Sequence, residues 1–462
     1  MKKAIAIGVV QLPLQIVLAL MVQAALINAA SIELVKWWYL LISLSPVFVI
    51  LEFAYPQIAI SYFNTSNGNK PIKPFVKKSL LIITCFQFIF FLVYSLAWNI
   101  NSIESLVFFL AMYLRSIGNI LISIVYAKGK ITQEKLYKLI FTSLFPFLFL
   151  ISLTLFDVSK FLILFIWLLS SFIIFAFAFI NYSKVNDDVK SQESEFNLSV
   201  KSNLRLILTT LPGVFIFNLS IYYLEFFYKG EQSVEVVTFG LFLQLFNVFN
   251  ILNSIFPSVC IPSISRKFHN NRNISSDVRK ILFINRTVSI FIIIGSVFFG
   301  ELILSSVLSS NDINFKYIIY FFISAIVIES LQVTLTSISI GTGYYKYHVP
   351  SFFSATFVLL VSYFLVPDYG SYGLMISILF AQIVTCFPVN SYLSSKRLGI
   401  SLRGIITNWL YIVISLVLSM YVISYNLDVI NLLIVYLSIF VCYMAVFKSD
   451  IINSLRYISN GD

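Results

Sequence analysis

Residues 160–182 read KFLILFIWLLSSFIIFAFAFINY, an apolar stretch whose single charged residue is Lys160. A helix needs about 20 mostly apolar residues to cross the roughly 30 Å hydrocarbon core of a bilayer. This stretch meets that requirement, because no further charge interrupts it before Lys184. It therefore predicts a membrane-spanning helix.

The composition extends this prediction to the whole chain. Hydrophobic residues make up 59% of the 462 residues and charged residues only 11%, and the mean hydropathy is +0.93. A soluble domain carries about 25% charged residues, which solvate its surface. The composition excludes a soluble protein and indicates an all-α integral membrane protein.

Similar apolar stretches recur along the chain and predict about fourteen transmembrane helices. Each is bounded by polar or charged residues and is long enough to span the bilayer. The predicted spans are 4–29, 36–63, 78–98, 104–127, 136–156, 160–182, 204–228, 234–262, 281–306, 315–341, 349–366, 371–394, 404–424 and 428–447.

Basic residues are distributed unevenly between the two sides of these spans. With the N-terminus inside, 26 of the 31 Lys and Arg residues lie in or beside inner segments, four lie in outer segments, and Arg115 lies within a span. Positive charge marks the cytoplasmic side of a membrane protein. The bias predicts that both termini are cytoplasmic. It also explains the net charge of +11 without a nucleic-acid partner.

Two pairs of short matches, six helices apart, indicate an internal repeat. The segments 55–60 (YPQIAI) and 256–261 (FPSVCI) end corresponding spans, as do 127–130 and 341–346. Transporters often arise from such repeats and bind their substrate between the halves. We therefore expect two six-helix lobes related by pseudo-twofold symmetry plus a C-terminal helix pair. The predicted divisions are an N-lobe at 1–182, a cytoplasmic linker at 183–203, a C-lobe at 204–394, and helices 13 and 14 with a cytoplasmic tail at 395–462.

Three stretches carry a resemblance to a known family. Residues 239–266 run from Phe-Gly-Leu through Phe256-Pro257 to Ile-Pro-Ser-Ile-Ser-Arg. Residues 369–374 read YGSYGL, and 396–399 read KRLG. These stretches resemble the polysaccharide exporters known as O-antigen and capsule flippases (Wzx type). That family belongs to the multidrug/oligosaccharidyl-lipid/polysaccharide exporter superfamily.

The resemblance implies a function as well as a fold. It implies a bacterial inner-membrane flippase that moves undecaprenyl-diphosphate-linked O-antigen or capsule repeat units by alternating access, for polysaccharide and lipopolysaccharide biosynthesis. Membrane lipid, a polysaccharide polymerase and a chain-length regulator are the further partners it implies, and helices 13 and 14 would form a groove for the lipid tail. No enzyme activity, cofactor or metal is expected, since the four cysteines lie singly in apolar runs.

Three charged residues fall deep within predicted spans: Glu52, Arg115 and Glu329. Charge inside a membrane is costly and by default suggests a functional site. The guanidinium of Arg115 suits phosphate oxygens. Arg115 could therefore bind the diphosphate or an acidic sugar, or it could form a structural ion pair with Glu52 or Glu329. The two glutamates could instead carry a coupling proton.

Polar residues and prolines within the spans complete the predicted site. Polar side chains can line a path for sugars, although they also form hydrogen bonds between helices. Proline kinks a helix and can act as a hinge or fix its shape. The predicted substrate-binding residues beside Arg115 are Asn119, Gln11, Gln15 and Asn250, and the predicted hinges are Pro56 and Pro257.

Two other functions remain open. An O-antigen polymerase-type membrane enzyme would have similar hydropathy. Such an enzyme needs acids or bases at an accessible surface, and the outer loops of this chain are short. A cation-coupled drug exporter of the same superfamily would share the twelve-helix core, and helices 13 and 14 favour the lipid-linked substrate over it.

Overall fold

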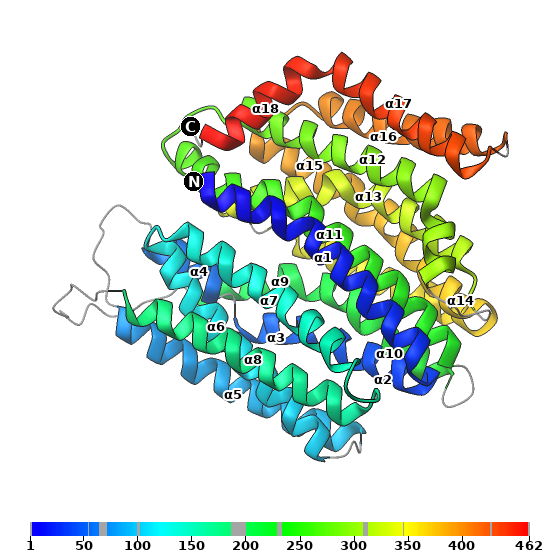
Figure 1. Ribbon diagram of the computed structural model, residues 1–462. Helices are drawn as coiled ribbons and strands as arrows, with labels where there is room; N and C mark the ends of the chain where they lie inside the picture. The colour runs from blue at the N-terminus through cyan, green and yellow to red at the C-terminus, as the bar shows by residue number, and fades with distance from the viewer. Residues whose placement is uncertain are drawn as a thin grey trace. The chain divides into compact units, whose positions relative to one another are not determined.

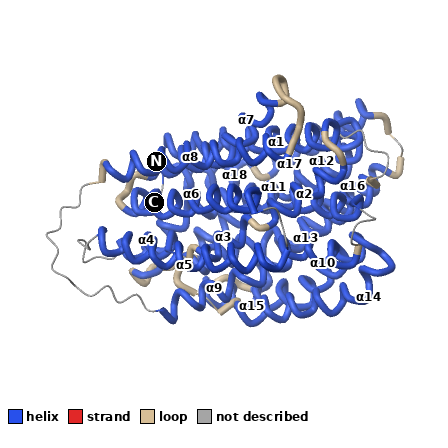
Figure 2. Tube along the Cα trace, turned by 90° about the horizontal axis from the view of Figure 1, so that it is seen from below, coloured by secondary structure: helices blue, strands red, loops and turns tan. Residues whose placement is uncertain are grey.

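The computed structural model describes residues 2–53, 55–63, 72–98, 102–185, 200–228, 233–307, 313–344, 346–425 and 427–460. Every regular element in these ranges is a helix, and no strand occurs among them (Figures 1 and 2). Within the same ranges, twelve helical segments are long and apolar enough to cross a membrane. The predicted class, an all-α multi-pass membrane protein, is confirmed.

The chain forms two compact units, Met1–Val214 and Phe215–Asp462. Unit 1 contains α1 (Lys2–Ala29), α2 (Ile32–Ser43), α3 (Ser45–Leu51), α4 (Tyr55–Phe63), α5 (Ile72–Trp98), α6 (Ser102–Ala127), α7 (Ile131–Ser152), α8 (Lys160–Ser183) and α9 (Val200–Val214). Unit 2 contains η1 (Phe215–Leu219), α10 (Ser220–Phe227), α11 (Ser233–His269), α12 (Ser275–Val307), α13 (Phe315–Gly341), α14 (His348–Ala381), η2 (Gln382–Cys386), α15 (Phe387–Leu398), α16 (Leu402–Ile423), α17 (Val429–Val446) and α18 (Lys448–Asn460). The predicted lobe boundaries remain a prediction, and most of the predicted linker lies outside the described residues.

The predicted spans 349–366 and 371–394 form a hairpin inside one continuous segment, His348–Leu398. The backbone reverses at Gly370, whose φ of 53° and ψ of −132° suit glycine alone. The two arms run antiparallel, because Gln382 Nε2 donates to Ser354 Oγ (3.3 Å) and the rings of Phe357 and Phe380 lie 5.9 Å apart. The count of fourteen spans and the cytoplasmic termini stay predictions.

The predicted span 36–63 is wrong as a single helix. The chain forms α2, α3 and α4, with a break at Glu52–Phe53 where Phe53 adopts a left-handed φ of 50°. Pro46 and Pro56 stand in the first turns of α3 and α4. Proline fits the first turn of a helix, but it cannot continue a helix that began before it. The two prolines therefore divide the predicted span.

The predicted cytoplasmic tail forms a further helix, α18, which packs against α12 and α11. The facing helices are also longer than predicted, since α11 extends to His269 and α12 begins at Ser275. The segment 263–280, which joins the predicted spans 234–262 and 281–306, is therefore largely helical. High hydropathy marks only apolar helices, whereas α18 is a short amphipathic helix.

The helices of the two units pack in a matching order. In unit 1, α1 packs against α7, and α6 packs against α4, α5 and α8. In unit 2, α10 packs against α14, and α13 packs against α11, α12 and α15. The helices of each unit thus pack around one central helix, which is α6 in unit 1 and α13 in unit 2. This order is the one that a six-helix repeat predicts.

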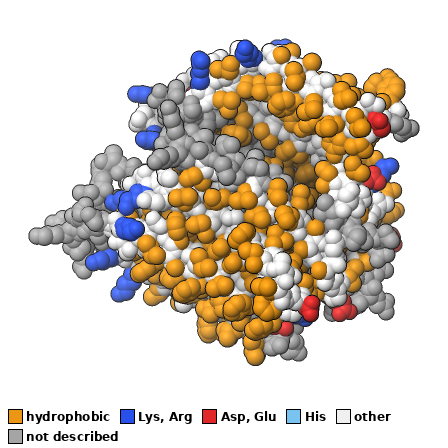
Figure 3. Space-filling view, in the orientation of Figure 1, with side chains coloured by type: hydrophobic (Ala, Val, Ile, Leu, Met, Phe, Trp, Pro, Cys, Tyr) orange, Lys and Arg blue, Asp and Glu red, His pale blue; other side chains and the backbone are white. Residues whose placement is uncertain are grey.

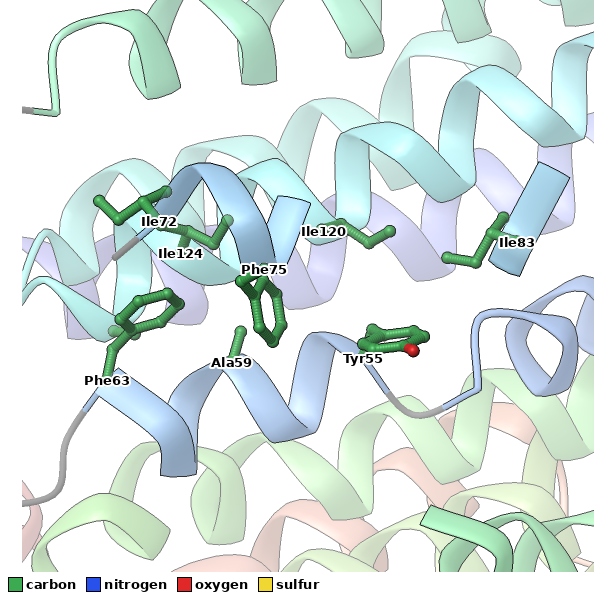
Figure 4. Close-up of a cluster of buried hydrophobic side chains, with 9 residues drawn as sticks. Tyr55, Ala59, Phe63, Ile72, Phe75, Ile83, Ile120 and Ile124 are labelled. Atoms are coloured by element: carbon green, nitrogen blue, oxygen red, sulfur yellow. The ribbon is translucent and has the colours of Figure 1, made fainter. Parts of the chain in front are cut away.

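A cluster of buried side chains joins α4, α5 and α6 within unit 1 (Figure 4). Phe75 of α5 lies against Tyr55 and Phe63 of α4, with ring centroids 5.8 and 5.4 Å apart. Ile120 and Ile124 of α6 complete the cluster. This packing fixes α4 beside α6 just after the break at Glu52.

The visible surface is mostly apolar, as expected for helices that face lipid (Figure 3). Lys and Arg side chains lie mainly at the left and top of this view, and Asp and Glu side chains mainly at its right and lower right.

Candidate functional site

Arg115 lies in α6, the central helix of unit 1, with its side chain directed at α8 and α7. It is 7% exposed. Its Nε donates to Ser171 Oγ (2.9 Å) and its Nη2 to Ser170 Oγ (3.3 Å). Its guanidinium carbon stands 4.3 Å from the ring centroid of Trp167 and 5.0 Å from that of Phe141. Hydroxyls and aromatic faces, all uncharged, therefore hold the cation.

Arg115 does not form an ion pair with Glu52. Across the described ranges, no carboxylate oxygen lies within 4.0 Å of the guanidinium. Nη1 has no hydrogen-bond partner among those residues either. A buried cation without a counterion is costly in an apolar medium. The arrangement leaves one edge of the guanidinium available to an anion.

Trp167, which stacks on Arg115, and Trp38, which contacts Trp167, carry unpaired donors. The rings of Trp38 and Trp167 meet edge to face, 5.2 Å apart. Phe145 stacks on Trp38 at 5.2 Å and contacts Trp167 at 4.8 Å. Both indole N–H groups are buried, and neither has a partner within the described part of the chain. Buried donors are normally satisfied, so two together mark a place that an acceptor could occupy.

Glu52 lies at the break between α3 and α4, and a chain of hydrogen bonds ties it to α6 and α7. Asn119 Nδ2 donates to Glu52 Oε1 (2.8 Å), and the Tyr137 hydroxyl donates to Asn119 Oδ1 (3.0 Å). Glu52 is 3% exposed. Gly118 leaves room for these hydrogen bonds, because a Cβ there would lie 2.8 Å from the Tyr137 hydroxyl oxygen. The predicted site residue Asn119 thus orients Glu52, and its side chain bonds to Glu52 and Tyr137.

In unit 2, Glu329 occupies the central helix α13 and is buried. Its Oε1 lacks a hydrogen-bond partner among the residues the structure describes. Nearby along α13, a separate network joins three helices. Asn253 Nδ2 donates to the Ser330 carbonyl (2.5 Å), and Asn285 Nδ2 donates to the Asn253 carbonyl (2.8 Å) and to Thr334 Oγ1. This network fixes α11 and α12 to α13.

The polar pairs of the two units occupy matching positions. Aligning Tyr55-Pro56 with Phe256-Pro257 places Glu52 on Asn253. Aligning Gly129 with Gly343 places Arg115 on Glu329, and Asn119 one residue before Thr334. Thr334 Oγ1 lies 3.4 Å from Asn253 Oδ1, as Asn119 lies against Glu52. The repeat thus carries opposite charges at one central position.

The remaining predicted site residues are three polar side chains and two prolines. Gln11 and Gln15 of α1 are buried, and neither atom of the Gln15 amide has a partner in the described ranges. The Asn250 side-chain oxygen is likewise unpaired there. Pro56 stands in the first turn of α4, whereas Pro257 lies inside the continuous helix α11. The hinge and substrate-binding roles stay predictions.

Arg286 is a buried charged residue that was not predicted as a site residue, because it lies close to the basic inner flank of its span. Arg286 lies in α12, is buried, and bonds to Asn408 of α16 and Tyr443 of α17. A signal was present, since Arg286 falls five residues inside the predicted span 281–306. Arg279 and Lys280, just before that span, made Arg286 read as one more basic residue of the inner flank.

Comparison with known proteins identifies the fold. No protein-family model matches the sequence, and no curated protein matches it at a significant level. Among solved structures, the lipid II flippase MurJ in an inward closed conformation is similar, with a TM-score of 0.68 and 13% identity over 96% of this chain and 99% of that one.

Two MATE transporters are also similar. A MATE transporter solved in complex with MaD5 gives a TM-score of 0.59 and 14% identity, covering 85% of this chain and 96% of that one. An outward-facing multidrug resistance MATE family transporter of the MOP superfamily gives a TM-score of 0.56 and 12% identity, covering 85% and 95%. The chain therefore has the fold of MOP-type transporters, and identities this low establish the fold alone.

Proposed function

We propose that this chain is a lipid-linked oligosaccharide flippase of the bacterial plasma membrane. It would move undecaprenyl-diphosphate-linked O-antigen or capsule repeat units to the outer leaflet by alternating access. The proposal draws on the fold shared with the lipid II flippase, which matches 96% of this chain. The MATE transporter leaves 15% unmatched, a share similar in size to the segment 395–462. A lipid-linked substrate would give the segment 395–462 a use, as a groove for the lipid tail.

Arg115 is the observation that carries the proposal. It is a buried guanidinium without a carboxylate partner among the described residues, and it stacks on Trp167, whose indole N–H is unpaired there. A diphosphate can accept from the free Nη1 edge and from N–H groups, forming charge-assisted hydrogen bonds. We propose that the substrate diphosphate reaches this cluster in the loaded state, with Asn119, Gln11, Gln15 and Asn250 contributing polar contacts along the sugar path.

The two buried glutamates are proposed to couple transport to an ion or proton. Glu52 is oriented by Asn119, and Glu329 has an oxygen that lacks a partner in the described ranges. Pro56 and Pro257 are proposed as the flex points of the two lobes. Movement there would exchange the inward and outward states.

Binding of a diphosphate lipid tests the role of Arg115. The purified protein is titrated with undecaprenyl diphosphate, and Arg115→Ala and Arg115→Lys are compared with wild type. Arg115→Ala should weaken binding by about 10- to 100-fold, since a hydrogen bond to a charged group is worth about 1.5–3 kcal/mol. Arg115→Lys keeps the charge but loses the planar stack on Trp167, so it should bind at an intermediate level.

Ser171→Ala provides the matched control. It removes one acceptor of Arg115 without changing the charge, so diphosphate binding should be retained. Equal binding by wild type and Arg115→Ala would exclude Arg115 as a ligand.

A cation-coupled drug exporter is the second candidate. The likeness to MATE transporters and the two buried glutamates favour it. This candidate predicts that the protein binds small organic cations and that Glu52→Gln or Glu329→Gln abolishes this binding. Undecaprenyl diphosphate should not affect it.

A further inference from the structure

Arg286 is a second buried arginine, in the part of unit 2 where the C-terminal helices pack. It lies within a candidate span of α12 and is 5% exposed. Its Nη1 donates to Asn408 Oδ1 (3.1 Å), and its Nη2 donates to the Tyr443 hydroxyl (3.3 Å). One guanidinium therefore connects α12 to both α16 and α17.

Aromatic rings surround the same guanidinium. Its carbon lies 4.5 Å from the ring centroid of Tyr411, 4.7 Å from that of Phe283 and 5.3 Å from that of Phe447. Ring faces attract a cation but carry no net charge that would neutralise it. The charge of Arg286 therefore remains uncompensated by these contacts.

No acidic residue supplies the missing charge. In the part of the chain that the structure describes, no carboxylate lies within ion-pair distance of Arg286. Its Nε is also buried without a hydrogen-bond partner there. A charged side chain in a span normally pairs with another charge or faces water. An unpaired donor on an unpaired cation points to an anion that binds from outside the chain.

The depth of Arg286 indicates which anion can reach it. Asn408 follows the start of α16 at Leu402 by six residues, and Tyr443 precedes the end of α17 at Val446 by three. At about 1.5 Å per residue, the guanidinium lies within about 10 Å of these helix ends. The predicted topology puts both ends at the cytoplasmic face, which is the level of lipid phosphates.

The surroundings of Arg286 are open to lipid. Tyr411 is 41% exposed, and Asn408, Tyr443 and Phe447 are half-buried. Almost none of the α17 span is buried within the protein. Arg403 and Lys448, at the adjoining helix ends, are exposed and basic, which favours an anionic headgroup.

We propose that Arg286, Asn408 and Tyr443 form a binding site for the phosphate of a membrane lipid in the cytoplasmic leaflet. The lipid lies against α12, α16 and α17, and its phosphate accepts from the guanidinium edge at Nε. The phosphate belongs either to an anionic phospholipid or to a polyprenyl lipid, since both present the same chemistry. This site lies apart from Arg115 in sequence and in contacts, and it does not depend on the proposed transport activity.

Native mass spectrometry of the purified protein tests the site. The probes are phosphatidylglycerol, undecaprenyl phosphate and uncharged diacylglycerol, added separately to wild type and Arg286→Gln. Wild type should retain both phosphate lipids and not diacylglycerol. Arg286→Gln should bind the phosphate lipids at least about tenfold more weakly, because it loses a charge-assisted hydrogen bond.

Arg397→Gln is the matched control. Arg397 also stacks on an aromatic ring (Phe268, 4.2 Å), but its Nη2 donates to the Thr342 carbonyl (2.6 Å), so it serves the turn after α13. Removing its charge should leave lipid binding unchanged. Equal binding by Arg286→Gln and wild type, or retention of diacylglycerol as strong as that of phosphate lipids, would overturn the proposal.

Two further arms separate the remaining outcomes. If Arg286→Gln fails to fold, Tyr443→Phe and Asn408→Ala replace it, and wild-type lipid binding in both contradicts the site. Displacement of phosphatidylglycerol by undecaprenyl phosphate identifies a polyprenyl lipid as the ligand, and the reverse identifies a phospholipid. Arg115→Ala should keep this binding even if it loses diphosphate binding, so the two proposals fail independently.

Discussion

At the scale of single residues, Arg115 and Arg286 are held in the same way. Each is buried, stacks on aromatic rings and donates to neutral oxygens, with no ion-paired carboxylate among the described residues. The planar guanidinium permits stacking and forked donation together, which an ammonium group does not. The sequence revealed Arg115 because apolar residues flank it on both sides. It could not reveal that Asn408 and Tyr443 would meet Arg286, because those contacts join distant helices.

The contact between Gly118 and Tyr137 yields a prediction at this scale. Gly118→Ala places a Cβ 2.8 Å from the Tyr137 hydroxyl, displaces the ring and breaks its bond to Asn119. We expect a loss of about 1–3 kcal/mol in the free energy of unfolding, seen as a lower thermal midpoint. Gly213→Ala is the control, since its Cβ would meet nothing within 4 Å and should not destabilise.

A double mutant separates the clash from other effects. Tyr137→Phe removes the oxygen and leaves the nearest ring carbons 3.6 Å from the new Cβ. In that background Gly118→Ala should cost little. If the cost of Gly118→Ala is the same in both backgrounds, the Tyr137 hydroxyl is not what requires glycine.

At the scale of elements, hydropathy located most of the helices, and local chemistry decided where they break. Span 160–182 was predicted almost to the residue, since α8 covers 160–183. Span 36–63 was not, because Pro46 and Pro56 restart the helix in the membrane. The turn at Gly370 depends partly on a remote residue, because Glu235 accepts from the Ser371 backbone N–H (2.6 Å). Neither the prolines nor the hydrogen bond to Glu235 changes the hydropathy of the chain. The length of an apolar stretch therefore could not predict these breaks.

Docking of α18 gives a prediction at the same scale. The Tyr457 ring lies 4.9 Å from the Lys280 ammonium and 5.3 Å from that of Lys267, which pairs with Asp277 (3.1 Å). Burial, together with the nearby Asp277 carboxylate, raises the pKa of Tyr457, so its hydroxyl stays protonated at neutral pH. Tyr457→Ala should therefore weaken the docking of α18 on α11 and α12.

Thiol labelling measures that docking. Ser454 is 2% exposed on the same helix, so Ser454→Cys, in a chain without its native cysteines, should react slowly with maleimide. Adding Tyr457→Ala should speed labelling severalfold, because α18 is then undocked for a larger fraction of the time and exposes the introduced thiol. Unchanged labelling would show that Tyr457 does not hold α18.

At the scale of the whole molecule, the sequence predicted an all-α, multi-pass transporter fold, and the likeness to MurJ and MATE structures agrees with it. The repeat was predicted from two short matches. Within each unit, the packing around α6 or α13 and the pairs Glu52–Asn119 and Asn253–Thr334 now support it. The substrate was predicted through resemblance alone, because sugar recognition depends on side chains whose positions the helices set only after folding.

Flipping by the reconstituted protein tests the central claim most directly. Proteoliposomes carry a fluorescent undecaprenyl-diphosphate-linked oligosaccharide, and a membrane-impermeant quencher reports its transfer between leaflets. Wild type and Ser171→Ala should flip the lipid at similar rates, and Arg115→Ala should be at least about tenfold slower, since it loses the charge-assisted contact with the diphosphate. Flipping by Arg115→Ala at the wild-type rate, or no flipping by wild type in liposomes where it exports small cations, would contradict the account.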